Sequence, residues 1–322
     1  MLALNGTMSK SILPTGLNDQ ITIIKAFNYK RFWKRHGMGY IFLAPFAILF
    51  FVFTVLPVFT AMGLGFFHYN IIETPRWAGL HNFMVLLTDD DVFLIALRNT
   101  LMFAVVIGPI GYIASFVFAW IIDQLKFKKG FALAFYAPSL TSGIAMSVVW
   151  LYFFSSDRYG FINDLLFQLG AIRDPILWNR DPRYIMIVVI IISVWMSMGT
   201  GFLVFMAGLQ GIPRELYEAA SIDGIRSRWQ ELFYLVLPSI KPQLLFGAVT
   251  AIVSSFGVFD IAVQVAGMPS PMYSAHTIIA HLFDHAFIRF SLGYSSAIAM
   301  FLFIMTFTLG RIAMRIFSSK DE

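Results

Sequence analysis

Long apolar runs alternate with polar stretches along the whole chain, and this pattern predicts the fold. A helix needs about 20 apolar residues to cross a bilayer. Six runs are long enough, at residues 40–67, 101–122, 130–154, 184–209, 244–265 and 292–309. Prolines lie inside the first three, at Pro45, Pro57, Pro109 and Pro138, where each removes a helical hydrogen bond. The sequence therefore predicts an all-α integral membrane protein with six transmembrane helices.

The composition agrees with a chain that lies mostly in lipid. Hydrophobic residues make up 58% and charged residues 13% of the 322 residues, whereas a soluble domain carries about 25% charged residues. The chain contains no cysteine, which excludes disulfides, thiol catalysis and thiolate metal sites. The first apolar run is too long for the hydrophobic region of a signal peptide, so we expect no cleaved leader.

The basic residues predict the orientation in the membrane. Six spans place both termini on one side, and most lysines and arginines fall on that side: Lys10, Lys25, Lys30, Arg31, Lys34, Arg35, Lys126, Lys128, Lys129, Arg214, Arg226, Arg228, Lys241, Arg311, Arg315 and Lys320. The opposite side carries fewer: Arg76, Arg98, Arg158, Arg173, Arg180, Arg183 and Arg289. Cytoplasmic loops are enriched in lysine and arginine, so both termini are predicted to be cytoplasmic. The net charge of +5 then needs no nucleic-acid partner.

One transmembrane domain is predicted at residues 39–317, between a cytoplasmic segment at 1–38 and a short tail at 318–322. Within the first segment, residues 21–35 mix isoleucine, phenylalanine and tryptophan with lysine and arginine. This mixture is typical of a helix that lies on an anionic membrane surface. A basic flank beside the first span explains it equally well.

The longest polar interval with helix signals of its own lies at residues 211–242. Pro213 suits the first turn of a helix, and Glu218 lies where the helix dipole favours negative charge. Gly224 is a natural helix stop, and Ser227 and Gln230 have the spacing of a capping box. The interval therefore predicts a short helix, a glycine turn and a second short helix on the cytoplasmic side.

This interval resembles the EAA loop of ABC-importer permeases, in which the motif glutamate and two alanines are followed by a glycine and later by Leu-Pro. The matching residues are Glu218, Ala219, Ala220, Asp223, Gly224 and Pro238. Leu237-Pro238 comes one residue late, so we expect the second helix to be rotated or bulged. The resemblance implies that the loop docks in a cleft of a cytoplasmic ATPase. The alternative is an ordinary amphipathic cytoplasmic loop.

Nearly the whole chain is similar to carbohydrate-type permeases, in particular to the larger membrane subunit of maltose importers. The similar stretches, in order, are Trp77–Phe83, Ala96–Thr100, Tyr159–Asn163, Ala207–Pro213, Phe256–Asp260 and Gly293–Ala297. The resemblance implies the type I ABC importer permease fold in a bacterial inner membrane. It implies a second homologous permease subunit, two cytoplasmic ATPase subunits, an extracytoplasmic solute-binding protein and a sugar or oligosaccharide as cargo. The chain itself would hold no cofactor, because ATP and Mg²⁺ would bind the ATPase.

Two predicted spans carry polar residues that could line a path for this cargo. The fourth span places Trp195, Ser197 and Thr200 at mid-depth, and such small polar residues either line a path or pack helices. Asp260 is a charge inside the fifth span, which marks either a polar path or a charge paired with another helix. The resemblance adds Met196 in the fourth span, and Ser254, Ser255, Val258 and Phe259 in the fifth, as cargo contacts.

Other chemistry has weaker support in the sequence. His281 and His285 have the i, i+4 spacing of helical zinc ligands, but no third ligand is evident, and we expect no metal site. The chain lacks a Gly-x4-Gly-Lys-Ser/Thr phosphate loop and any nucleophile–base pair, so we expect it not to be an enzyme.

Two other classes of protein remain as alternatives. An ion-coupled secondary transporter would need more ionisable residues deep in its spans, and an enzyme or receptor scaffold would need a catalytic pair or a signalling domain. Arg173, Arg180 and Arg183 favour either an acidic polysaccharide fragment as cargo or a solvated surface.

Overall fold

We describe the chain from a computed structural model that covers residues 29–141 and 143–318. The chain separates into two compact units, residues 1–59 and residues 60–322, which are described in turn. Most of the predicted surface helix at 21–35, and nearly all of the predicted tail at 318–322, lie outside the described residues.

The first unit is built from one long apolar helical stretch. Helix α1 (Tyr29–Phe50) continues through a π-helical turn, η1 (Phe51–Val55), into α2 (Leu56–Leu64), which crosses the boundary to the second unit. Large apolar side chains such as Phe42 and Phe53 are 77% and 74% exposed. Apolar side chains exposed on all faces of a helix are expected where lipid is the solvent.

The second unit contains the remaining elements. They are β1 (Phe67–His68), β2 (Arg76–Trp77), α3 (His81–Thr88), α4 (Asp91–Asp123), α5 (Lys128–Tyr136), η2 (Ala137–Leu140), α6 (Gly143–Phe153), α7 (Phe161–Gln168), α8 (Pro182–Gln210), α9 (Arg214–Ile222), α10 (Arg228–Glu231), η3 (Leu232–Val236), α11 (Leu237–Ser239), α12 (Lys241–Phe256), α13 (Asp260–Ala266), η4 (Pro271–Tyr273), α14 (Ile278–Phe283), η5 (Asp284–Ile288) and α15 (Leu292–Ser318). The two strands form an antiparallel pair in which Phe67 faces Trp77.

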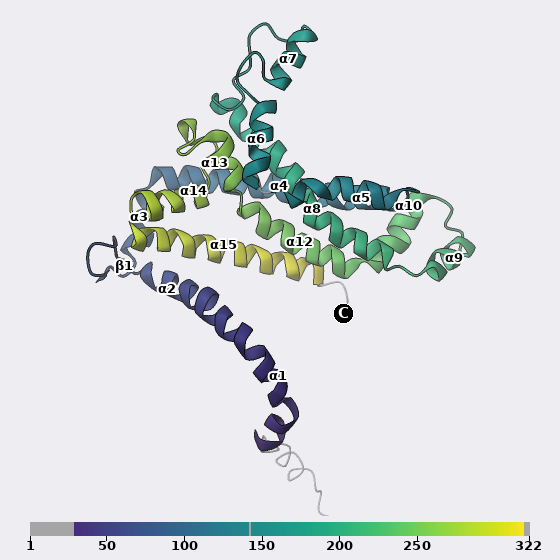
Figure 1. Ribbon diagram of the computed structural model, residues 1–322, viewed down its shortest axis with the longest axis horizontal. Helices are drawn as coiled ribbons and strands as arrows, with labels where there is room; N and C mark the ends of the chain where they lie inside the picture. Colours follow the sequence, from purple (N-terminus) through teal and green to yellow (C-terminus); the bar gives the residue numbers. More distant parts are fainter. Residues whose placement is uncertain (1–28, 142, 319–322) are drawn as a thin grey trace, which may run out of the picture. The chain divides into compact units, whose positions relative to one another are not determined.

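Long helices form the centre of this unit. Helix α8 packs along α4, and α12 packs against α4, α8 and α15 (Figure 1). Small residues allow the closest approach: the hydroxyl of Ser115 on α4 donates to the carbonyl of Met198 on α8 at 3.2 Å. Helices in lipid associate through such close packing and interhelical hydrogen bonds, because the hydrophobic effect does not separate them from lipid.

Five helical stretches in the described residues are long and apolar enough to cross a membrane: Gly37–Leu64, Asp91–Asp123, Pro182–Gln210, Lys241–Ala266 and Leu292–Arg315. They correspond to five of the predicted spans. The second helix, Asp91–Asp123, begins about a third of its own length before residue 101, where the predicted span begins. The predicted third span differs. It is divided into α5 and α6 by the 3₁₀ turn η2, so the described residues contain no single helix over 130–154. Pro138 lies in the break, where it offers no N–H to a helix.

Three buried asparagines hold the turns between these helices. Asn82 donates to the carbonyls of Gly65 and Phe67, and Asn99 donates to those of Tyr273 and His276. Asn163 is fully buried and donates to three carbonyls, and its own oxygen accepts from the Trp178 indole at 2.9 Å. An amide is one of the few side chains that can satisfy carbonyls and N–H groups together. Each asparagine belongs to one of the motif stretches in the sequence, which gives those stretches a structural role.

Helix α15 offers a test of packing at its first turn. A methyl group added at Gly293 would lie 2.0 Å from the backbone oxygen of Phe67, while one added at Gly310 on the same helix would meet no atom within 4 Å. We expect Gly293→Ala to lower the free energy of unfolding by about 1–3 kcal/mol, which would lower the melting temperature of the detergent-purified protein. Gly310→Ala should leave the melting temperature unchanged or raise it. Equal effects of the two substitutions would contradict this packing.

Candidate functional site

The fifth predicted span is broken in its C-terminal half. Helix α12 ends at Phe256, residues 257–259 are not helical, and α13 begins at Asp260. Gly257 has a low helix propensity, and the backbone of Phe259 is not helical, with φ −128° and ψ −61°. Backbone that is not helical at membrane depth is tolerated where it lines a cavity or is buried in protein. Asp260 lies in the first turn of α13, where the helix dipole stabilises its negative charge.

The break between α5 and α6 meets the break between α12 and α13. Helix α6 packs against α13, and a methyl group on Gly143, the first residue of α6, would be 4.0 Å from Oδ2 of Asp260. The 3₁₀ turn approaches α8 so closely that a methyl group on Gly199 would overlap the side chain of Ser139. Two interrupted helices therefore adjoin at one place in the bundle.

A cavity of about 400 Å³ lies beside these breaks, between α4, α8 and α12. It is lined by Ile107, Gly108, Gly111, Tyr112, Ser115, Gly143, Ser193, Met196, Ser197, Thr200, Gly201, Phe205, Gly247, Thr250, Ala251, Ser254, Ser255, Gly257, Val258, Phe259, Asp260 and Ile261. The many glycines and serines leave the space that larger side chains would fill. Its volume lies within the range of small-molecule sites.

The structure brings together almost all of the predicted path residues. Met196, Ser197, Thr200, Ser254, Ser255, Val258, Phe259 and Asp260 all line this cavity. Trp195 does not, because it faces another side of α8 and its ring packs edge-on against Trp150 at 5.2 Å. Whether the lining residues touch cargo stays a prediction.

The polar groups of the lining offer hydrogen bonds that the described chain does not use. Ser197 and Ser255 donate their protons to helix carbonyls, so their oxygens remain as acceptors. The buried hydroxyl of Ser193 has no partner. Buried polar groups are nearly always paired with protein, water or ligand. The cavity therefore suits a molecule that presents several hydroxyl groups.

Asp260 is the one charged side chain among the lining residues. No lysine, arginine or histidine of the described chain forms an ion pair with it. This differs from the alternative that Asp260 is a structural charge paired with another helix of the same chain. Its carboxylate gives the cavity a negative potential, which disfavours anions.

The loop at 211–242 has the predicted helix–turn–helix form. Helix α9 ends in a Schellman motif: the N–H of Ile225 bonds to the carbonyl of Ala220 at 3.0 Å and that of Gly224 to Ser221 at 3.3 Å. Gly224 has φ +92°, which glycine adopts at no steric cost. Ser227 and Gln230 form the predicted capping box at the start of α10. The glycine stop and the capping box are thus confirmed, whereas Pro213 is the residue just before α9 and Glu218 lies in the middle of that helix.

A π-helical turn accommodates the late Leu237-Pro238. In η3 the N–H of Leu237 bonds to the carbonyl of Leu232, five residues earlier. A π turn contains one residue more between bonded groups than an α turn. The additional residue is therefore bulged out locally, and Pro238 follows directly in α11. This is the bulge that the spacing of the motif led us to expect.

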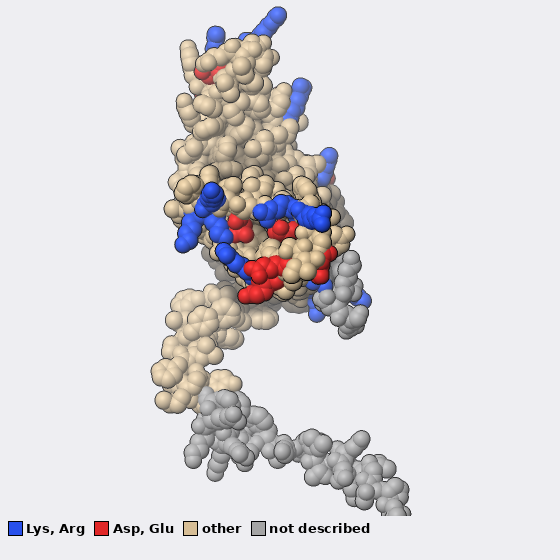
Figure 2. Space-filling model, turned by 90° about the vertical axis from the view of Figure 1, so that its right-hand side faces the viewer, with Lys and Arg blue, Asp and Glu red and all other residues tan. Residues whose placement is uncertain are grey.

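Helix α9 is attached by one side and exposed on the other. Tyr217 packs against the buried cluster that contains Phe202 and Phe205, and burial raises its pKa, with smaller contributions from Glu231 and Asp123. Glu218 and Ala219 on the next positions are exposed. Acidic and basic side chains gather on the end of the unit that carries α9 and α10 (Figure 2). Helix α9 thus presents one face to solvent.

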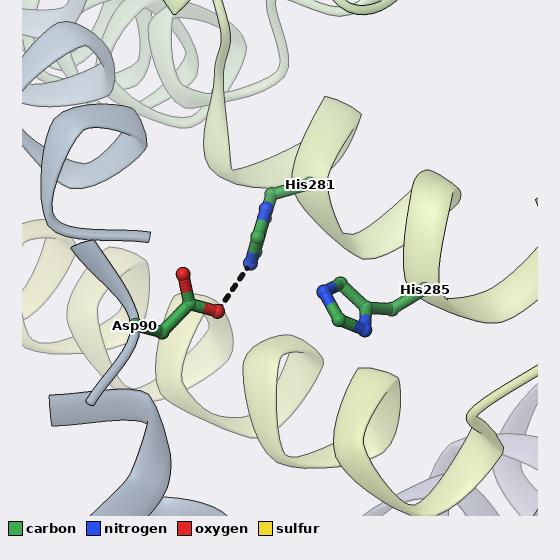
Figure 3. Close-up of side chains that lie close together, drawn as sticks. All are labelled: Asp90, His281 and His285. Carbon is green, nitrogen blue, oxygen red and sulfur yellow. Dashed lines mark hydrogen bonds and ion pairs between the residues drawn. The ribbon is translucent and has the colours of Figure 1, made fainter. Parts of the chain in front are cut away.

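A second polar cluster joins His281 and His285, which the sequence singled out, to Asp90, which it did not. The carboxylate of Asp90, in the turn between α3 and α4, accepts from His281 Nε2 at 2.9 Å and from the Tyr294 hydroxyl at 2.6 Å, and its other oxygen accepts from the Phe93 N–H at 2.8 Å. His285 lies beside them (Figure 3). These residues are about 190 positions apart along the chain, a separation that local spacing cannot reveal.

The cluster has unusual electrostatics. Burial raises the pKa of Asp90, but the hydrogen bonds from Tyr294, Phe93 and His281 outweigh burial and lower the pKa overall. Burial lowers the pKa of His285 to about 4, and its neighbour His281 adds to this shift. Asp90 is therefore ionised and His285 neutral near pH 7.

Comparison with known proteins shows extensive similarity to transporter subunits. A probable ABC transporter permease protein, YesP, of Bacillus subtilis is 34% identical over 292 residues, which cover 89% of this chain and 92% of the relative. The lactose transport system permease protein LacF of Rhizobium radiobacter is 30% identical over 84% of this chain and 91% of its own length. No family model matches the sequence.

Among solved structures, a bacterial ABC transporter involved in import of the acidic polysaccharide alginate contains a chain with the same fold. The TM-score is 0.79 at 21% identity, with 91% of this chain and 99% of that chain covered. The same type of transporter in complex with an alginate pentasaccharide-bound periplasmic protein gives a TM-score of 0.77.

Proposed function

The chain belongs to the permease family of ABC transporters, and we propose that it forms one half of the membrane path of an importer for an uncharged sugar or oligosaccharide. The observation that carries this proposal is the cavity beside the two helix breaks, which is lined by glycines and by hydroxyl groups whose oxygens can accept hydrogen bonds, with that of Ser193 unpartnered in the described chain. Sugars need this combination, since their hydroxyl rims require hydrogen-bond partners and their rings require room and apolar contacts.

We propose an uncharged cargo because the single charged side chain on the lining is the carboxylate of Asp260. An anionic sugar would face Asp260 with no lysine, arginine or histidine among the lining residues to compensate. The relatives include the permease protein of a lactose transport system and that of an arabinooligosaccharide transport system, whose names fit a neutral cargo. The acidic polysaccharide alternative, which the alginate transporter would suggest, is disfavoured by the same carboxylate.

The proposed topology has six crossings with cytoplasmic termini in the bacterial inner membrane. Five crossings are the long apolar helices, and the α5–η2–α6 segment, third along the chain, is the remaining crossing as a discontinuous helix. Transporters use such interrupted helices at their cargo sites, because the freed backbone groups can face a cavity. The distribution of lysine and arginine supports the orientation, and it brings α9 and α10 to the cytoplasm.

The proposed mechanism is alternating access driven from outside the chain. Two ATPase subunits, which bind ATP and Mg²⁺, dock on α9 here and on the matching helix of a second, homologous permease subunit. Their closure draws the two docking helices together and opens the path to the extracytoplasmic binding protein. An ion-coupled mechanism lacks support, since the family couples to ATP and Asp260 is unaccompanied by further carboxylates in the cavity lining.

Site-specific crosslinking tests the docking step. The chain has no cysteine, so Ala219→Cys introduces a unique thiol on the exposed side of α9. We expect this thiol, labelled with a maleimide photocrosslinker, to form a light-induced crosslink to an ATPase subunit in membranes, and ATP to change the yield.

The matched control is Leu165→Cys on α7, which is also exposed on a short helix but is predicted to lie outside the cell. It should give no ATPase crosslink. Failure of Ala219→Cys to capture a nucleotide-binding protein, or equal capture by Leu165→Cys, would overturn the proposed coupling.

A further inference from the structure

Three potential metal ligands from separate elements converge at the end of the second unit that carries α3 and α14. Asp90 comes from the α3–α4 turn, His281 from α14 and His285 from η5, and their side chains point toward one another (Figure 3). One ligand atom of each lies within 4.8 Å of the others. We propose that Asp90, His281 and His285 bind a divalent transition metal, zinc by preference, and so join the α3–α4 turn to the α14–η5 segment.

The donor set matches the chemistry of zinc. Two imidazole nitrogens and one carboxylate oxygen form a common three-ligand set, which leaves a fourth position for water or another ligand. In a tetrahedral site with bonds of about 2.1 Å, ligand atoms are about 3.4 Å apart. His281 Nε2 and Asp90 Oδ2 are 2.9 Å apart in a hydrogen bond, so zinc binding would release the Nε2 proton to solvent, move these two atoms slightly apart and turn His285 toward them.

The two histidines have nitrogens that protein groups do not satisfy. His281 is 3% exposed and its Nδ1 has no hydrogen-bond partner. The ring of His285 makes no hydrogen bond to the described residues, and it packs against the rings of His281 and Tyr294, with centroids 4.7 Å away in both cases. The ring nitrogens of His285 are therefore free to bind a cation beside the hydrogen-bonded pair of Asp90 and His281.

The carboxylate is oriented before any ion binds. The Phe93 N–H holds Oδ1 of Asp90, and the Tyr294 hydroxyl donates to Oδ2. Hydrogen bonds of this kind orient metal ligands and tune their affinity. The cluster thus offers a cation one carboxylate held in a fixed orientation and one nearby nitrogen from each histidine.

A cation can reach this place through an adjoining cavity of about 560 Å³. Its lining includes Asp89 and Asp91 on either side of Asp90, and the one arginine in the lining, Arg289, is paired with Asp284 at 2.7 Å. The potential at the site is therefore negative, which attracts a divalent cation.

Zinc binding to the full-length, detergent-purified protein tests the proposal directly. The protein should carry no polyhistidine tag and should be stripped with a chelator first. We expect calorimetry to show about one Zn²⁺ per chain, and Co²⁺ to give the absorption of a tetrahedral site. Zn²⁺ should raise the melting temperature, whereas Mg²⁺, which prefers six oxygen ligands, should not.

His285→Gln is the decisive variant, because His285 makes no side-chain hydrogen bond in the described chain and its loss should not unfold the protein. It should weaken Zn²⁺ binding at least about tenfold and keep the metal-free melting temperature. The matched control is His81→Gln, an exposed histidine of the same cavity, which should bind as wild type does. Unaltered affinity in His285→Gln, equal loss in His81→Gln, or no saturable Zn²⁺ binding to the wild type would refute the site and leave the cluster as a hydrogen-bonded contact.

Discussion

Gly224→Val is expected to reduce sugar uptake in reconstituted vesicles at least about tenfold, with ATP hydrolysis no longer stimulated by cargo. Gly224 ends α9 with φ +92°, and a β-branched residue held there costs about 1–3 kcal/mol. A shift of 1.4 kcal/mol changes a population tenfold. The variant would therefore populate the docked form of α9 less, while the spans and their cavity remain intact.

Gly170 provides a closely matched control. It ends α7 in the same Schellman motif, with φ +68° and bonds from Gly170 to Phe167 and from Ala171 to Leu166. Neither glycine has an atom within 4 Å of an added methyl group. Gly170→Val therefore imposes similar backbone strain far from the docking helix. If both variants uncouple equally, or if Gly224→Val transports normally, α9 does not transmit the motion.

Ser254→Trp is expected to abolish uptake while preserving assembly with the ATPase. Ser254 on α12 lines the cavity of about 400 Å³, and an indole there would occupy much of the space that cargo needs. Initial uptake rates of radiolabelled neutral oligosaccharide, with ATPase co-purification as the assembly measure, provide the test.

Val253→Trp separates blockage from general disturbance of α12. Val253 precedes Ser254 but lies outside this cavity and is 54% exposed, so its larger replacement should face lipid and leave most uptake intact. Normal uptake in Ser254→Trp would show that cargo passes elsewhere. Loss in both variants would mean that α12 tolerates no enlargement, and that the cavity is not the cause.

The amino-acid pattern predicted the docking loop in detail because every signal there is local. A proline at a helix start, a glycine at a helix stop and a capping box each act within four residues. Even the bulge was foreseeable, since one additional residue before Leu237-Pro238 must be accommodated somewhere in the second helix. The structure accommodates it in η3.

The cavity was predictable only as a set of residues. The residue pattern and the resemblance to permeases supplied half of its α8 and α12–α13 lining, yet the sequence did not reveal that α12 stops at Phe256 or where α5 and α6 separate. Hydrophobic content continues through both breaks, and periodicity cannot distinguish a continuous apolar helix from an interrupted one. The sequence likewise could not show that Trp195 points away from the cavity, because the direction of its side chain depends on how α8 packs against α6.

The sequence by itself determined which segments enter lipid and the local form of the docking loop, because hydrophobicity and helix signals are properties of neighbouring residues. Tertiary structure alone decided that Asp90 meets His281 and His285, and that Gly143 approaches Asp260. Those contacts join positions more than 100 residues apart. They arise from how the helices pack, since the α3–α4 turn and α6 carry one partner of each contact and the α14–η5 segment and α13 carry the other. No pattern within any of these segments encodes the distance between them.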